Sequence, residues 1–136
     1  MVTKLKPLTQ YIKDLSFENY AAQKNKFESS KLDVNLNLNI KQKQLKIDLL
    51  EITIVLLLEA KKLDEKKFII ELSYASTFLI DNTITALDKK KLSFVDCPNI
   101  MFPFIRQIIF NISRDSGFLP INLELINFHE LFHSQK

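Results

Sequence analysis

Apolar and polar side chains alternate without a break between residues 32 and 40. A period of two over this length is typical of a strand that buries one face. Two later runs, residues 50–60 and 68–80, keep an apolar residue at almost every even position, while their odd positions are mixed. A shorter stretch, residues 11–18, alternates in the same way. The pattern predicts an antiparallel meander of about four strands with one apolar face.

The last third of the chain has a different period. A helix is expected to run to about Asp115 and to end at Gly117. Asp96 can cap this helix, and Pro98 can occupy its first turn. Apolar residues cover most of its circumference, so it must be buried on most sides, yet one sheet covers only one side. We therefore predict an α+β fold in an oligomer, with long buried helices lying between sheets. A second, short helix is expected over about residues 127–134.

Composition narrows the classes of function. The 136 residues, 46% of them hydrophobic, suit a single domain over residues 1–136 with a short N-terminal tail at 1–8. The one glycine excludes a Gly-rich phosphate loop. The single cysteine excludes an internal disulfide and fits a reducing compartment. No secretory signal and no run long enough to span a membrane is evident, so we expect a cytoplasmic protein that does not insert into membranes.

The residues His129, Glu130 and His133 form a literal H-E-x-x-H pattern. On a helix both histidines share one face and can bind zinc, with the glutamate as general base of a peptidase. However, the sequence holds no other histidine and ends three residues later, so a third ligand would have to be a distant carboxylate. We therefore favour coincidence and predict no metal and no enzymatic activity, with a zinc peptidase as an alternative.

Two further features have simpler interpretations than a site. Cys97 precedes a helix, where a thiolate nucleophile is favoured, but a buried structural cysteine is the better interpretation. The net charge is +3, with lysine clusters at 61–62, 66–67 and 89–91. Arginine, the usual reader of bases, occurs only twice, so we interpret the clusters as solvated turns and predict no nucleic-acid partner.

Acidic residues recur on the strand face opposite the apolar one. In residues 11–18, Leu15 and Phe17 share one face while Asp14, Ser16 and Glu18 share the other. In the two long strands the carboxylates opposite the core side are Glu51, Glu59 and Glu71. From pattern alone, ordinary solvation of an outer sheet face is the favoured explanation.

Phenylalanine is unusually frequent, with 11 in the chain. Five of them are candidates for an apolar groove, although filling the core is the default for each. These five are Phe17, Phe27, Phe78, Phe118 and Phe128.

Two blocks of the sequence resemble the SecB family of bacterial protein-export chaperones. The first is residues 11–18 (YIKDLSFE), and the second starts at residues 97–104 (CPNIMFPF). The second continues through Arg106, the Arg-Asp-x-Gly-Phe stretch at 114–118, Pro120 and Asn127-Phe128. The 114–118 stretch is most similar to the alphaproteobacterial branch of the family.

The resemblance implies a homotetramer, a dimer of dimers, in which long helices lie between two eight-stranded antiparallel sheets. It implies a bacterial chaperone without nucleotide or other cofactor, which holds unfolded precursor proteins and delivers them to the SecA motor ATPase. A SecB-like chaperone of a toxin–antitoxin system is the alternative within the family.

The resemblance also assigns a partner site. Position by position, the SecA-contacting patch of the family falls on Asp14, Glu18, Ile69 and Glu71, which favours a functional role for the acidic face. Such carboxylates mainly attract a basic partner and fix the position in which it binds, so binding should weaken as salt increases. A typical SecB is strongly acidic, whereas this chain has a net charge of +3, so we expect a weaker SecA contact.

Overall fold

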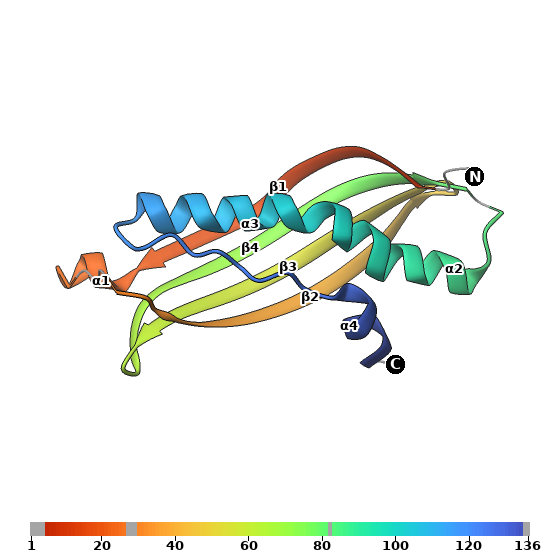
Figure 1. The fold of residues 1–136 in the computed structure, drawn as a ribbon. Helices are drawn as coiled ribbons and strands as arrows, with labels where there is room; N and C mark the ends of the chain where they lie inside the picture. The colour runs from red at the N-terminus through yellow and green to blue at the C-terminus, as the bar shows by residue number, and fades with distance from the viewer. Residues whose placement is uncertain (1–4, 27–29, 82, 135–136) are drawn as a thin grey trace.

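The computed structural model describes residues 5–26, 30–81 and 83–134. One antiparallel sheet is covered on one face by a long helical segment and by the chain that follows it (Figure 1). The elements in chain order are β1 (Leu5–Asn19), α1 (Tyr20–Gln23), β2 (Asp33–Lys46), β3 (Leu49–Lys62), β4 (Glu65–Ile80), α2 (Ala86–Lys91), the π-helical turn η1 (Leu92–Asp96), α3 (Cys97–Asp115) and α4 (Phe128–Ser134). This confirms a four-stranded antiparallel sheet followed by a long helix and a short one.

The strand order corrects the expected meander. The order is β1-β4-β3-β2, so β2, β3 and β4 follow one another as hairpins but β1 lies beside β4. This is a Greek-key arrangement. The β3–β4 hairpin turns at Leu63 and Asp64, both with positive φ (51° and 66°), which is the geometry of a tight two-residue turn. The β1–β2 connection is longer and contains α1. The meander prediction was wrong because hydrophobic alternation identifies the faces of a strand but not the strands beside it.

Strand β1 also begins earlier than expected. Leu5 already pairs with Ile80, so residues 5–8 belong to the sheet and not to an N-terminal tail. The register shifts between Pro7 and Thr9 and again between Ile12 and Asp14. Each shift adds a residue to the strand and interrupts the period of two, which hides the first half of β1 from the hydrophobic pattern.

The long helix starts upstream of the expected cap. Asp96 is itself helical and makes no capping hydrogen bond. The helical segment begins instead at α2, where the Thr85 hydroxyl accepts a hydrogen bond from the Asp88 amide at 3.1 Å, and it continues through η1 into α3. A proline lacks an N–H and its ring clashes with the carbonyl four residues earlier. The wider π turn directly before Pro98 accommodates that ring within a continuous helix.

The expected end of α3 is confirmed. Gly117 has φ of 91°, a conformation that glycine adopts without steric cost. The Phe118 amide then donates back to the Ser113 carbonyl at 3.2 Å, as in a Schellman cap. The chain returns over the sheet toward α4 (Figure 1). Along this return the Arg106 Nε–H donates to the Leu123 carbonyl at 2.8 Å.

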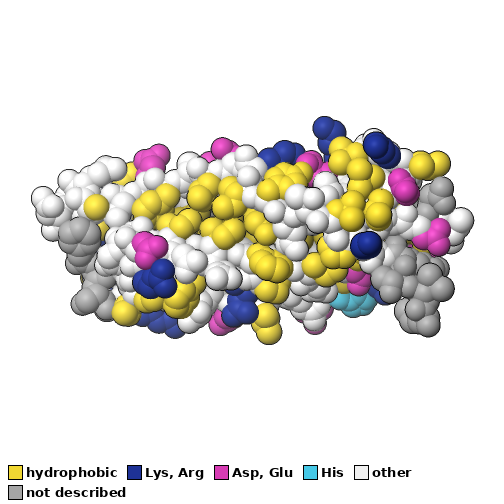
Figure 2. Space-filling view, turned by 90° about the horizontal axis from the view of Figure 1, so that it is seen from above, with side chains coloured by type: hydrophobic (Ala, Val, Ile, Leu, Met, Phe, Trp, Pro, Cys, Tyr) yellow, Lys and Arg dark blue, Asp and Glu magenta, His cyan; other side chains and the backbone are white. Residues whose placement is uncertain are grey.

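The core lies between the sheet and the helical layer. The even-numbered apolar residues of β3 and β4 are all buried there, as the alternation predicts. Helix α3 contributes residues at helical spacing, including Met101, Ile105 and Ile109. Its opposite side is not covered: Phe104 is 47% exposed, and Ile100 and Ile108 are half-buried. Seen from above, apolar side chains are open along much of this side of the molecule (Figure 2).

No helix within the described part of the chain combines the length and apolarity needed to cross a membrane.

Candidate functional site

The four residues expected to form a partner patch lie together on the outer face of the sheet, away from the helices. Glu18 on β1 is paired with Ile69 on β4, and Glu71 is paired with Ser16. Asp14 is paired with Ser73, one row further along. Paired cross-strand residues have Cβ atoms about 4.5–5.5 Å apart, so these side chains form one continuous surface.

A fifth residue, Glu59 on β3, extends this surface. It is paired with Ile69 from the other side, so Ile69 lies between two glutamates. Burial, a hydrogen bond to Glu18 and the charges of Glu18, Glu59 and Glu71 all raise the pKa of Tyr20. Lys66 Nζ lies 3.8 Å from a Glu59 carboxylate oxygen. We call Glu18, Glu59, Ile69 and Glu71 the acidic end of the outer face.

Glu51 is on the same face but is not part of the acidic end. It is only 9% exposed. The Tyr11 hydroxyl donates to one of its carboxylate oxygens, and Lys13 Nζ lies 2.7 Å from the other. These hydrogen bonds, Lys13 first and Tyr11 second, lower the pKa of Glu51 although burial opposes them. In return, the hydrogen bond to Glu51 raises the pKa of Tyr11 to about 12, with help from burial. The Glu51 carboxylate therefore stays ionised, and Lys13 balances its charge within the sheet surface.

The register shift in β1 creates this network. Because the pairing moves from Ile12 directly to Asp14, Lys13 is the extra residue, and it reaches Glu51 on the outer face. Lys41 and Lys43 project from β2 on the same face, opposite Thr53 and Glu51. Together with Lys13 they surround a polar depression of about 500 Å³. The outer face thus has an acidic end and a basic end, with Asp14 beside the basic one.

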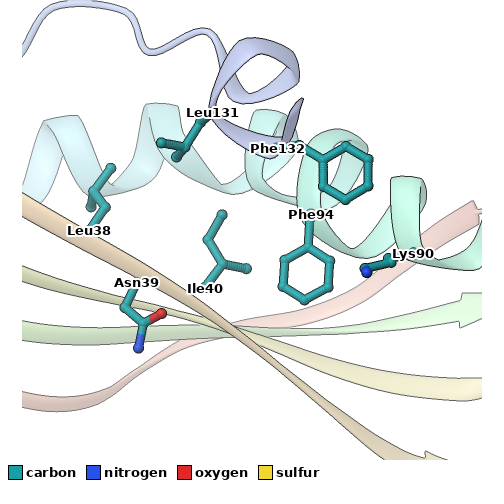
Figure 3. Close-up of a pocket in the computed structure, with 7 residues that line it drawn as sticks. All are labelled: Leu38, Asn39, Ile40, Lys90, Phe94, Leu131 and Phe132. Carbon is teal, nitrogen blue, oxygen red and sulfur yellow. The ribbon is translucent and has the colours of Figure 1, made fainter. Parts of the chain in front are cut away.

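An apolar cavity of about 180 Å³ lies on the other side of the sheet, between β2, the helical segment and α4 (Figure 3). Leu38 and Ile40 form its floor, and Phe94, Leu131 and Phe132 approach from the helices. The rings of Phe94 and Phe132 are stacked, with centroids 6.2 Å apart.

Sequence reasoning missed the residues of this cavity. Phe94 lies in the part of the helical segment upstream of the expected start. Leu131 and Phe132 were placed on the short helix, but the pattern of a single helix does not show what it packs against. The alternation over residues 32–40 was the one signal that pointed to the cavity floor.

Of the five phenylalanines considered for a groove, three are core residues, which was the default interpretation. Phe78, Phe118 and Phe128 are at most 6% exposed and fill the core. Phe17 is half-buried, with its ring centroid 5.6 Å from that of Phe68. Phe27 lies outside the described residues. Within the described chain the open apolar surface is therefore not built from these side chains.

The histidine pattern lies on α4, as expected. The Nε2 atoms of His129 and His133 are 3.1 Å apart. Among the described residues no group of three or more His, Cys, Asp or Glu side chains is arranged to hold a metal ion, whereas catalytic zinc sites use three protein ligands.

Cys97 is buried, as the structural interpretation predicted, and burial, assisted by Asp96, raises the pKa of its thiol. The lysines at 89–91 lie in helix α2, those at 61–62 end strand β3 and those at 66–67 lie at the start of β4, so the assignment of the clusters to turns was wrong.

Comparisons with known proteins agree with this architecture. A family model described as "Preprotein translocase subunit SecB" matches residues 2–136. A protein-export protein SecB from Jannaschia sp. (strain CCS1) is 34% identical, over 97% of this chain and 80% of that protein. Its counterpart from Orientia tsutsugamushi (strain Boryong) is 38% identical, over 94% of this chain and 81% of that protein.

A solved structure is also similar. It is the SecB-like chaperone of Mycobacterium tuberculosis in complex with a ChAD peptide from the HigA1 antitoxin. The TM-score is 0.75, and the match covers 90% of this chain and 91% of that chain. Because the two sequences are only 11% identical, this likeness establishes the fold alone.

Proposed function

The chain belongs to the SecB family of protein-export chaperones, and from this premise we propose that it is an ATP-independent holdase of the bacterial cytoplasm. It binds precursor proteins while they are unfolded, keeps them competent for translocation and delivers them to the SecA motor. The observation that carries the proposal is the combination of family membership with an open apolar cavity on one side of the sheet and a charged face on the other.

Client segments bind at the apolar cavity and the chain that leads to it. Leu119 and Leu125, on the return from α3 to α4, are 51% and 80% exposed, so apolar surface continues beyond the cavity. Burying one leucine- or phenylalanine-sized side chain there stabilises a complex by about 1.5–3 kcal/mol before ordering costs. Such contacts are non-directional, which suits a chaperone that accepts many sequences. The peptide complex of the M. tuberculosis SecB-like chaperone supports a peptide-binding role for this fold.

SecA docks on the outer face of the sheet, at the acidic end. Glu18, Glu59 and Glu71 surround the apolar Ile69, so a basic partner finds both charge and a small apolar contact. Asp14 contributes less, because Lys13 precedes it in the chain and Lys41 and Lys43 border the same depression. The basic end also repels a basic partner, so the interaction is weaker than the acidic end alone would make it, and salt screens the attraction that remains.

The working form is a homotetramer, a dimer of dimers. Two apolar surfaces of the single chain need a cover: the exposed side of α3 around Phe104, and the edge strand β1, where Ile12 is 47% and Leu15 39% exposed. An uncovered edge strand presents unpaired N–H and C=O groups that can pair with a strand of another chain. Pairing two β1 edges would join two sheets into one of eight strands, and stacked helices would cover Phe104.

The holdase activity is tested by dilution of a denatured precursor into the chaperone while aggregation is followed by light scattering. The wild-type chain should delay aggregation. Phe132→Ser, in the cavity, should weaken the delay, whereas Leu63→Ser should not, because Leu63 is 88% exposed at the tip of a hairpin away from the cavity. A wild-type protein that gives no delay at any concentration contradicts the proposal.

SecA docking is tested by binding at low salt. Asp14→Lys with Glu71→Lys should abolish SecA binding and leave the oligomeric state unchanged. The matched control, Asp88→Lys with Glu130→Lys, makes the same change in charge on exposed sites of α2 and α4 and should bind normally. Equal affinity of both double variants would show that the acidic end is not the docking site.

A role beside a toxin–antitoxin system is the second candidate, favoured by the fold of the M. tuberculosis structure and its antitoxin peptide. A low-salt pull-down from the native host separates the two functions. Co-purification of SecA supports export, and co-purification of an antitoxin supports the second candidate.

A further inference from the structure

Helix α4 carries two imidazoles one turn apart whose ring nitrogens face each other. The Nε2 atoms of His129 and His133 are 3.1 Å apart, and the ring planes meet at 81° with centroids 4.3 Å apart. Both side chains are exposed to solvent. We infer that the pair is a binding site for a divalent transition-metal cation of the kind that prefers imidazole: Cu²⁺, Ni²⁺ or Zn²⁺.

The geometry fits two adjacent positions of one metal ion. Metal–imidazole nitrogen bonds are about 2.0–2.1 Å long. Two nitrogens 3.1 Å apart, each at that distance from one metal, subtend an angle of about 100°. This value lies between the 90° of square-planar or octahedral coordination and the 109° of a tetrahedron, so the separation of the two nitrogens suits either class of metal.

The proton balance is simple. Without metal, one ring donates its Nε2–H to the Nε2 lone pair of the other. On binding, the donating ring shifts that proton to its Nδ1, and both Nε2 lone pairs then face the cation. Two neutral imidazoles become two neutral ligands, and no oxidant or further reactant is needed. Acid opposes binding, because an imidazolium has no lone pair to offer.

The site binds metal but is not assembled for catalysis. Among the described residues no third His, Cys, Asp or Glu completes it, whereas catalytic zinc sites use three protein ligands. Affinity should follow the order set by imidazole ligands, with Cu²⁺ bound more tightly than Ni²⁺ or Zn²⁺ and with Mg²⁺ and Ca²⁺ not bound.

Metal binding at this pair stabilises α4, because a ligand that bridges residues four apart binds only the helical form. Leu131 and Phe132 on the same helix line the apolar cavity. The cation therefore holds the wall of that cavity in place. This consequence for client binding rests on the proposed function, whereas metal binding itself does not.

The test uses the full-length chain without an affinity tag. Cu²⁺ and Zn²⁺ are titrated by calorimetry into the wild-type chain and into His129→Gln, His133→Gln and Glu130→Gln, with Mg²⁺ as the negative control. We expect one ion per chain. Either histidine variant should bind at least about ten-fold more weakly, since even the loss of an outer-shell partner costs about 10–100-fold. Glu130→Gln should bind as the wild type does.

Two spectroscopic measurements separate ligation from a merely structural effect. Electron paramagnetic resonance of the Cu²⁺ complex should show hyperfine coupling to two nitrogens, reduced to one in either variant. Amide hydrogen exchange in α4 should slow when Zn²⁺ is added to the wild type only. If His129→Gln and His133→Gln bound metal as tightly as the wild type, or if the spectrum lacked two nitrogens, the site would be overturned. A failed aggregation assay would overturn the holdase function alone.

Discussion

On strand β3, Leu56 faces the helices and is completely buried, whereas its neighbour Leu57 faces outward between the charged rows and is half-buried. The same contrast runs along the sheet. Its inner face is a continuous apolar layer under α3. Its outer face combines an acidic end, a basic end and Glu51, which is paired with Lys13. Alternate residues of one strand thus contribute to the apolar core on one side and to the charged outer surface on the other.

The comparison shows that close apolar packing and exposed charge are divided between the two faces of the sheet. Removing atoms from the inner face leaves a cavity in close-packed surroundings, and the chain cannot relax to fill it. Charges on the outer face interact through water, where they stabilise the fold little but act on an approaching partner over a distance set by salt. Glu51 is the exception, because it is charged and buried on the outer face.

The largest expected difference is between Leu56→Ala and Leu57→Ala. Leu56→Ala should lower the free energy of unfolding by about 2–5 kcal/mol, since it leaves a cavity in the core. Leu57→Ala should cost on the order of 1 kcal/mol, because water replaces the lost atoms. Urea unfolding at one fixed protein concentration measures both. Equal losses would break the division by face.

A smaller effect on the free energy of unfolding is expected at Glu51, the charged residue that is buried on the outer face. Glu51→Gln should lower the free energy of unfolding by on the order of 1–2 kcal/mol at pH 7, because it weakens hydrogen bonds to a charged acceptor. The folded-state pKa of Glu51 is lowered, so its stabilisation is fully present above the ordinary glutamate pKa of about 4.3. It is lost as pH falls below that value, through the lowered pKa.

Stability measured from pH 7 to pH 3 checks the role of Glu51. The wild type should lose more stability over this range than Glu51→Gln does, and the two curves should converge at the acid end. Lys13→Met serves as the matched variant, because it removes the first cause of the lowered pKa. Parallel curves for wild type and Glu51→Gln would mean that the network contributes nothing to folding.

The smallest expected effect on stability is at the exposed carboxylates of the outer face. Asp14→Lys with Glu71→Lys, the change designed to abolish SecA binding, should alter the free energy of unfolding by no more than about 0.5 kcal/mol per site, since both side chains are exposed. Thermal unfolding followed by circular dichroism checks this value. A loss as large as that of Leu56→Ala would show that the face is structural.

Much of the local structure could be predicted from the chain. Alternation over residues 32–40, 50–60 and 68–80 identified three strands and their inner faces, because a period of two leaves no other assignment of sides. Gly117 marked the end of α3 for an equally local reason, its positive φ. The residues assigned to the SecA patch were correctly expected to share one strand face, and their role in SecA binding stays a prediction.

The errors share a physical cause. The β1–β4 pairing, the bulge at Lys13 and the cavity under α4 all depend on contacts between residues distant in the chain. A hydrophobic pattern records which side of an element is buried but not what it is buried against. For that reason Phe78, Phe118 and Phe128 were considered for a groove although they fill the core, and Phe94 and Phe132 were overlooked.

By itself, the sequence determined the strands, their apolar faces, the end of α3 and the resemblance to SecB, because each depends on residue types at short spacing. Only the tertiary structure decided that β1 lies beside β4 and that Glu51 pairs with Lys13 while Glu59 joins the acidic end. The physical reason is that a charge or a ring nitrogen acts through its neighbours in space. Those neighbours are chosen by strand register and helix packing, not by distance along the chain.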